Sequence, residues 1–211
     1  MGSRHRVQEI GLAYHIIIKA VAGVRAFPDS YHRSRYLEFF AEEIVKSDWR
    51  CLGYTVLGTH VHLVVELRDL TLSSGFQRLH STYAKWFNRR HARAGALWQA
   101  RYYDVMIESD FQFLETQRYV ALNAVRAGLA ERPEDWPYCH YGAVVGSFAP
   151  DPLVDEDAIL RLLGRNRRQA RLRFQEYVDE PDPRRRRQMF LRGASDRAQT
   201  PAARARRAKR A

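Results

Sequence analysis

Cysteine is scarce in this chain, and long apolar runs are absent. The 211 residues include two cysteines, Cys51 and Cys139, which lie far apart and form no CxxC pair. A disulfide framework or a thiolate zinc site is therefore not expected, and a reducing cytoplasm is the natural compartment. No apolar run approaches the ~18 residues that span a bilayer, and no apolar signal core follows the first six residues. The sequence thus predicts a cytoplasmic protein without a membrane partner.

Acidic residues are scarce in the C-terminal part of the chain. Residues 161–211 hold 17 Lys and Arg against 5 Asp and Glu, whereas residues 1–160 hold 18 against 19. The net charge of +11 therefore comes from the last fifty residues. Such an asymmetry indicates a polyanionic partner, most simply nucleic acid, with a solubilising tail as the alternative.

Apolar residues make up 45% of the chain, which is enough for a folded core. Their spacing alternates between the periods of strands and helices. The expected order is strand, helix, strand, strand, helix, strand, helix, over residues 13–19, 30–45, 51–57, 60–67, 72–91, 98–107 and 110–122. This order is the split βαβ plan, an α+β fold in which an antiparallel sheet carries helices on one face.

The chain is expected to divide into three parts. Residues 1–152 form the main domain, and residues 133–152 close it as an irregular strap. Residues 153–180 form a helical extension of one or two helices. Residues 181–211, with the run of arginines at 184–187, read as a basic and flexible tail, with room for one short helix near residues 189–191.

Two histidines two residues apart stand out in the third predicted strand. Residues i and i+2 of a strand point to the same face, so His60 and His62 project side by side. Two imidazoles held in this way are half of a metal site. The alternative is a pair of surface histidines on a strand. The other histidines, among them His15, read as ordinary core or surface residues.

The last predicted helix of the main domain can supply the other half of the site. Tyr119 and Asn123 are four residues apart and share one helical face. A helix packed across the central strands would bring them to the histidines. Asn123 then offers an amide oxygen as a third metal ligand, and Tyr119 offers a phenol beside the metal. Taken singly, Tyr119 reads as a packing aromatic and Asn123 as a helix cap.

This set of groups suits the cleavage of a phosphodiester. A metal held by two imidazoles and one amide keeps positions open for a substrate oxygen. A tyrosine oxygen can attack phosphorus and form a covalent phosphotyrosine. A free phenol has a pKa of about 10, so a nearby cation must help it ionise, and Arg101, Arg118 and Arg126 are the candidates. Tyr102 and Tyr103 are the fallback nucleophiles.

At this point the chain resembles a known family, the single-tyrosine HUH transposases (transposase-17), and in particular the REP-associated tyrosine transposase branch. The resemblance covers residues 10–150. The stretches that carry it are YTVLGTHVHLVV (54–65), YAKWFNRR (83–90), LWQARYY (97–103), RYVALNAVRAGL (118–129) and PEDWPY (133–138). The chain departs from the usual family pattern at Thr59 and Ala124, where the family commonly has Asn and Pro.

The resemblance implies a ferredoxin-like fold and a divalent metal, Mg2+ or Mn2+. It implies that His60, His62 and Asn123 hold the metal and that Tyr119 is the nucleophile. It also implies single-stranded DNA as the partner, with REP-like palindromic hairpins. The expected protein is therefore a nucleoid-associated DNA nickase and strand transferase. The long C-terminal extension favours a monomer with a self-contained site, and a dimer is the alternative.

The basic residues expected to contact DNA are Arg101, Arg118, Arg126, Arg184, Arg185, Arg186 and Arg187. Two other functions remain open from the sequence. One is a module that binds DNA or RNA hairpins without cutting them. The other is a hydrolase that uses the same histidines with water, for which Tyr119 would be dispensable.

Overall fold

The computed structural model describes residues 8–192. Its centre is a sheet with the strand order β2-β3-β1-β4, in which every neighbouring pair is antiparallel. The strands are β1 (Ala13–Lys19), β2 (Trp49–Val56), β3 (His60–Leu67) and β4 (Tyr103–Ile107). Together with the two helices that connect them, this topology is the split βαβ plan, and the predicted fold class is confirmed.

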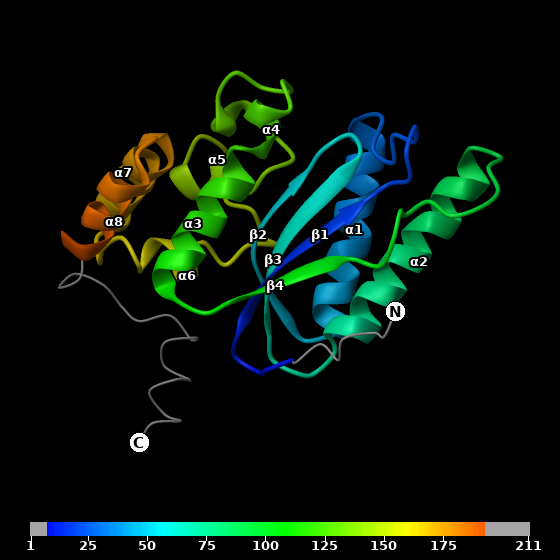
Figure 1. Ribbon diagram of the computed structural model, residues 1–211, viewed down its shortest axis with the longest axis horizontal. Coiled ribbons are helices and arrows are strands. Elements are labelled where there is room, and N and C mark those ends of the chain that lie inside the picture. The colour runs from blue at the N-terminus through cyan, green and yellow to red at the C-terminus, as the bar shows by residue number, and fades with distance from the viewer. Residues whose placement is uncertain (1–7, 193–211) are drawn as a thin grey trace.

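Helices α1 (Ser30–Lys46) and α2 (Leu72–Arg90) lie on one face of the sheet, and α3 (Asp110–Ala121) lies on the other (Figure 1). The first face holds most of the aromatic core. Trp49 of β2 stacks on Phe76 of α2 with 4.5 Å between ring centres. Gly75 permits this contact, because a Cβ at this position would lie 2.4 Å from the Trp49 ring.

The expected helix starts are present. The Asp29 carboxylate accepts a hydrogen bond from the backbone N–H of His32 at 3.0 Å, and the Ser109 hydroxyl accepts one from Gln112 at 3.2 Å. Both side chains thereby satisfy amide groups that have no partner inside the helix. They fix where α1 and α3 begin.

The strap after α3 contains the short helices η1 (Pro133–Asp135) and α5 (Tyr141–Val145). Between them, the chain pairs with the outer edge of β2. Val56 N–H donates to the Tyr138 carbonyl at 2.9 Å, and His140 N–H donates to the Tyr54 carbonyl at 3.1 Å. This pairing satisfies backbone groups that an edge strand would otherwise expose.

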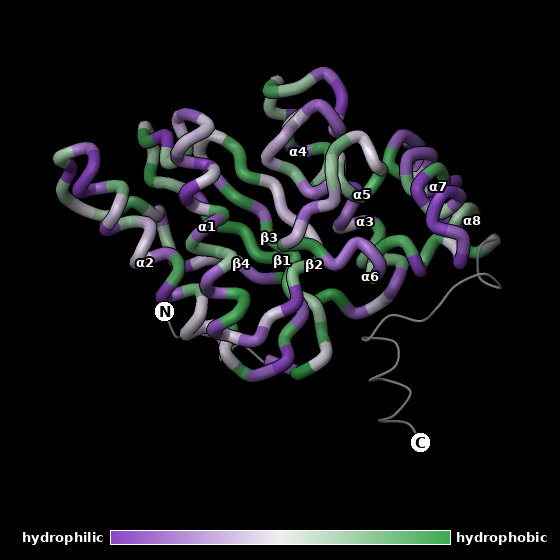
Figure 2. Tube along the Cα trace, turned by 180° about the vertical axis from the view of Figure 1, so that it is seen from behind, coloured by the Kyte–Doolittle hydropathy of each residue, from purple (hydrophilic) through white to green (hydrophobic). Residues whose placement is uncertain are grey.

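The C-terminal extension consists of α6 (Glu156–Leu160), α7 (Arg167–Asp179) and α8 (Pro183–Arg192). Figure 2 shows hydrophobic residues along the strands and a largely hydrophilic α7. The predicted tail differs from the structure, because residues 183–192 form a helix longer than the expected short one. The rest of that predicted tail, residues 193–211, lies outside the described residues.

Two other predictions need correction. The fourth strand is shorter than residues 98–107, since residues 100–102 leave the ladder. Trp98 pairs with Ala20, and Gln99 N–H donates to the Lys19 carbonyl. Tyr119 and Asn123, expected on one face of a single helix, lie on two helices, because α3 ends at Ala121 and α4 (Asn123–Arg126) begins after Leu122. No helix in residues 8–192 has the length and apolar character needed to cross a membrane.

Candidate active site

The histidine pair lies on the sheet face that α3 covers. The pairing register places His62 opposite Ile17 of β1 and Thr55 of β2, and His60 opposite Lys19. The two imidazole centres are 5.2 Å apart. The structure therefore places His60 and His62 side by side, as the alternation of the strand predicts.

Burial keeps both imidazoles neutral. His62 is 2% exposed, and burial, followed by the neighbouring His15, lowers its pKa to about 2. Burial also lowers the pKa of His60, with a smaller effect from the Lys19 ammonium. A neutral imidazole has a lone pair for a metal, whereas an imidazolium has none. At neutral pH both side chains are in the form that can bind a cation.

The sequence reading missed a third imidazole. His15 of β1 is 8% exposed, and its Nε2 lies 3.0 Å from Nδ1 of His62. If the His62 Nδ1–H donates this bond, the lone pair on His62 Nε2 is left for a metal. Periodicity alone could not find His15, because its contact with His62 depends on how β1 and β3 are aligned.

Tyr119 lies over these histidines. Its ring centre is 5.4 Å from that of His62 and 5.7 Å from that of His15. The side chain is 41% exposed, so a substrate can reach its hydroxyl. The Arg126 guanidinium lies 5.1 Å from the Tyr119 ring centre, within range of a cation–π contact, and puts a positive charge beside the phenol. Of the three candidate arginines, Arg126 is the one whose guanidinium contacts the Tyr119 ring.

Asn123 lies one turn beyond Tyr119, although a helix break separates them. Its side-chain Nδ2 donates to the Tyr119 carbonyl at 2.6 Å, and the residue is 8% exposed. This bond commits the amide N–H to the backbone, so the amide oxygen is the atom that could serve a metal. The structure holds the Asn123 side chain to the backbone of Tyr119.

The donor set fits a divalent metal. His62 Nε2 is buried without a hydrogen-bond partner, which is costly unless a ligand satisfies it. The Thr59 hydroxyl lies 3.1 Å from His60 Nδ1 and can fix the other imidazole with its Nε2 free. Within residues 8–192, no group of three or more His, Cys, Asp or Glu side chains is arranged for a metal. The amide oxygen of Asn123 is the candidate third donor, since its N–H group is bonded to the backbone.

The predicted DNA-binding arginines fall into two groups. Arg101, Arg126, Arg184, Arg185 and Arg187 are exposed. Arg118 is half-buried, and its Nε donates to the Val178 carbonyl at 2.8 Å. Arg186 departs from the prediction, because it is 5% exposed and its guanidinium binds both carboxylate oxygens of Glu115 at 2.7 Å.

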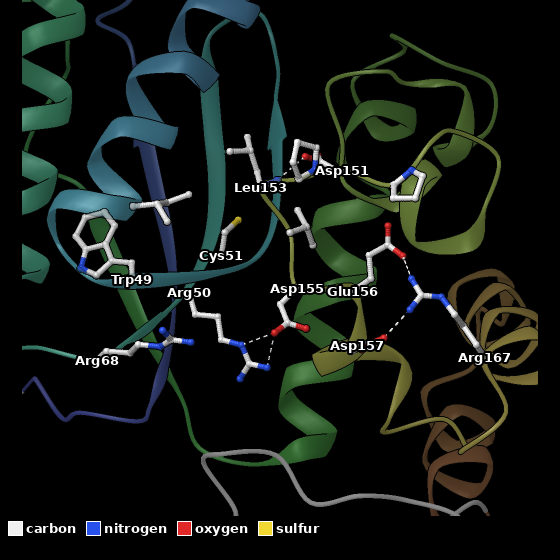
Figure 3. Close-up of a pocket in the computed structure, with 14 residues that line it drawn as sticks. Trp49, Arg50, Cys51, Arg68, Asp151, Leu153, Asp155, Glu156, Asp157 and Arg167 are labelled. Carbon is white, nitrogen blue, oxygen red and sulfur yellow. Dashed lines mark hydrogen bonds and ion pairs between the residues drawn. The ribbon is translucent and has the colours of Figure 1, made fainter.

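A cleft of about 480 Å³ lies between β2 and the start of α6, away from the histidines (Figure 3). Its charged side chains are paired with one another. Arg50 binds Asp155 at 2.5 Å, and Arg167 binds Glu156 and Asp157. The Arg50–Asp155 pair attaches the extension to the sheet, and the Arg167 pairs join α6 to α7, so the cleft is a structural joint.

Comparison with known proteins agrees with this geometry. Residues 9–123 match the model of a family described as transposase, IS200-like. A protein of Haemophilus influenzae described as a REP-associated tyrosine transposase is 28% identical over 97 residues. That match covers 41% of this chain and only 55% of the relative's length.

A solved structure shares the fold. It is that of a REP-associated tyrosine transposase bound to a REP hairpin, with a TM-score of 0.59 and 18% identity, covering 74% of this chain and 90% of that one. The family model covers more than half of the present chain and includes both histidines, Tyr119 and Asn123. The chain belongs to the IS200-like transposase family.

Proposed function

We propose that this protein is a metal-dependent endonuclease and strand transferase that cuts hairpin-containing single-stranded DNA through a covalent 5′-phosphotyrosine. The observation that carries the proposal is the contact of the Tyr119 ring with His62, 5.4 Å between centres, above an unpartnered His62 Nε2. Nucleophile and metal-binding imidazoles then belong to one chain, which supports a self-contained monomer.

In the proposed reaction, the Tyr119 oxygen attacks the phosphorus of the scissile diester. A bond forms between the phenol oxygen and phosphorus, and the bond from phosphorus to the 3′ oxygen breaks. The phenolic proton ends on the released 3′-hydroxyl. In the reverse step a 3′-hydroxyl attacks the phosphotyrosine, and Tyr119 recovers its proton. No outside reactant is consumed, so the strand can be rejoined.

The protein groups have distinct parts in this scheme. Arg126 places a positive charge against the ring of Tyr119. His60, His62 and Asn123 would hold the metal, which supplies a Lewis acid for the phosphodiester oxygen. Imidazole ligands favour Mn2+ over Mg2+.

The substrate class rests on the family and on charge. The relative and the solved structure are both REP-associated transposases, and the solved one holds a REP hairpin. Exposed arginines such as Arg126, Arg184 and Arg185 supply phosphate contacts, and the basic C-terminal residues add to them. A REP-like hairpin with single-stranded flanks is therefore the proposed partner.

The test uses a labelled hairpin with single-stranded flanks, incubated with Mn2+ and resolved on a denaturing gel. We expect a protein–DNA adduct from the wild-type chain. Tyr119→Phe should abolish the adduct and retain hairpin binding, because only the phenol oxygen is lost. Tyr31→Phe, an exposed tyrosine on α1, is the matched control and should form the adduct normally.

Each other outcome identifies a different function. If DNA is cleaved without an adduct, and Tyr119→Phe still cleaves it, the protein is a hydrolase that uses water. Hairpin binding with no adduct under any divalent metal would indicate a binding module that does not cut. An adduct mapped by mass spectrometry to Tyr102 or Tyr103 would move the nucleophile to the start of β4.

A further inference from the structure

A recess lies beside the histidines on the same face of the sheet. It has a volume of about 220 Å³ and is lined by residues from β1 and from the segment that leads into β4. It exists because the two strands differ in length there. Two residues of β1 separate Ile17 from Ala20, whereas four residues separate Tyr103 from Trp98 on the facing segment. The extra residues leave the ladder and open the recess.

The recess combines an exposed aromatic ring with a cation. Tyr103 is 64% exposed, an unusual exposure for a large ring on a sheet, and the proposed chemistry does not use it. The Lys19 side chain is also exposed and lines the same recess. An exposed ring beside an ammonium group is the combination that binds unpaired nucleotides, through stacking of the base and pairing with the phosphate.

The register connects the recess to the proposed site. Tyr103 lies opposite Ile17, and Ile17 lies opposite His62, so their side chains share one face along a single row across the sheet. Lys19 lies opposite His60. A strand whose scissile phosphate lies at the histidines therefore carries a neighbouring nucleotide over β1 towards Tyr103.

We propose that this recess is a nucleotide-binding subsite, in which the base of an unpaired nucleotide next to the scissile phosphate stacks on Tyr103 and its phosphate pairs with Lys19. The proposal rests on the proposed function, since it assumes that single-stranded DNA reaches the histidines. Its ligand class is an unpaired nucleotide of any base, because stacking on an aromatic ring tolerates every base.

The experiment measures binding without cleavage. A fluorescein-labelled DNA hairpin with defined single-stranded flanks is titrated in EDTA with proteins carrying Tyr119→Phe, and the anisotropy gives Kd. Adding Tyr103→Ala should weaken binding by about 5- to 150-fold, the range for loss of one stacked base. Tyr103→Phe should retain affinity, and Tyr31→Ala, which removes an exposed ring on the other face, should change nothing.

Oligonucleotides with single abasic positions locate the base. At one flank position, the abasic DNA should bind Tyr103→Ala and the Tyr103 protein equally, because the stacking partner is already missing. Lys19→Gln should reduce the slope of log K against log salt by roughly 0.7, the value for one phosphate contact on a single strand.

The recess is not a subsite if Tyr103→Ala binds as tightly as the parent, or if no abasic position removes the difference. Failure of the catalytic proposal gives a different result. If the wild-type chain forms no adduct but Tyr103→Ala weakens DNA binding, the subsite proposal stands and the nuclease proposal fails. If the adduct forms but Tyr103→Ala does not change DNA binding, the nuclease proposal stands and the subsite proposal fails.

Discussion

His15 touches both halves of the proposed site, since its imidazole lies 3.0 Å from His62 Nδ1 and its ring packs against Tyr119. A buried partner of this kind sets which nitrogen of a ligand histidine carries the proton. Partners of metal ligands are commonly worth a factor of 10 to 100 in metal affinity. The third imidazole thus contacts both the proposed ligand His62 and the proposed nucleophile Tyr119.

We expect His15→Ala to weaken Mn2+ binding by about 10- to 100-fold, because His62 Nδ1 loses its partner. Isothermal titration with Mn2+ in the absence of DNA measures this directly. His91→Ala is the control, since His91 pairs with His32 far from the site. Equal Mn2+ affinity in His15→Ala and wild type would show that His15 only fills space.

Some site residues are predictable from the sequence, and others depend on contacts between distant segments. His60, His62 and Tyr119 were identified from their spacing, and the structure brings their rings together. His15 was not, because its partner depends on the alignment of two strands 47 residues apart. The burial of Arg186 was equally unpredictable from the sequence. Arg186 is one of four consecutive arginines, and only its contact with Glu115 of α3 distinguishes it from the other three.

At the scale of elements, the C-terminal helices hold α3 in place. Glu115, in the middle of α3, accepts hydrogen bonds from Arg186 of α8 and from the Tyr177 hydroxyl of α7 at 2.6 Å. One turn along, Arg118 reaches the Val178 carbonyl. These bonds lie on the helix that carries Tyr119, so the extension fixes the orientation of the proposed nucleophile.

Breaking this contact should cost stability and slow cleavage. Glu115→Gln removes the charge that Arg186 requires, and we expect a loss of about 1–3 kcal/mol in the free energy of unfolding. Urea unfolding measures the loss, and the initial rate of adduct formation measures the effect on Tyr119. Gln188→Ala, at an exposed uncharged residue of α8, should change neither quantity.

The double variant Glu115→Gln with Arg186→Gln separates pairing from packing. If the pair acts as a unit, the double variant should be less destabilised than the two single effects added together. Strict additivity of the two losses would mean that the helices dock without help from this ion pair.

Most elements were predictable because each repeats a local pattern. The strands at 13–19 and 60–67 and the helix starts at residues 30 and 110 match the structure closely. Two predictions were wrong at segments whose conformation depends on tertiary contacts: the length of the fourth strand and the conformation of residues 183–192. Residues 100–102 lie between Trp98, which still pairs with Ala20, and the strand that begins at Tyr103, yet they leave the ladder. The helix on Pro183–Arg192 was read as tail because its composition is so basic.

At the scale of the whole molecule, several histidines are buried in the neutral form. Burial lowers the pKa of His15 and of His140 to about 4, and that of His80 to about 3. An unfolded histidine has a pKa of about 6.5, so below that pH the unfolded chain binds protons that the folded chain does not. The contribution of these neutral histidines to the free energy of unfolding is therefore complete above pH 6.5, and it is lost as the pH falls towards 4.

We expect the free energy of unfolding to fall by several kcal/mol, on the order of 2–3 for each buried histidine, between pH 7 and pH 4. Urea unfolding curves at a series of pH values measure this slope. A flat profile between pH 7 and pH 5 would contradict the neutral burial of these side chains.

The charge distribution makes a second prediction for the whole chain. Residues 193–211 carry six Lys and Arg and one Asp. Replacing Arg204, Arg206, Arg207 and Arg210 with Gln should make hairpin binding less sensitive to salt, by up to about 0.9 in slope for each lost phosphate contact. Adduct formation at saturating DNA should be unchanged. An unaltered salt slope would mean that these arginines do not touch DNA.

The covered edge of β2 has a consequence for assembly. Tyr138 and His140 bond to the outer side of β2 near one end, and Asp155 N–H donates to the Cys51 carbonyl near the other. A second copy of the chain therefore has no free row of backbone groups on that side to continue the sheet. Growth by strand addition is left with β4, the strand that carries Tyr103. Two copies that paired through their sheets would therefore meet beside the recess. Self-association and DNA binding would then compete for the β4 edge of the sheet.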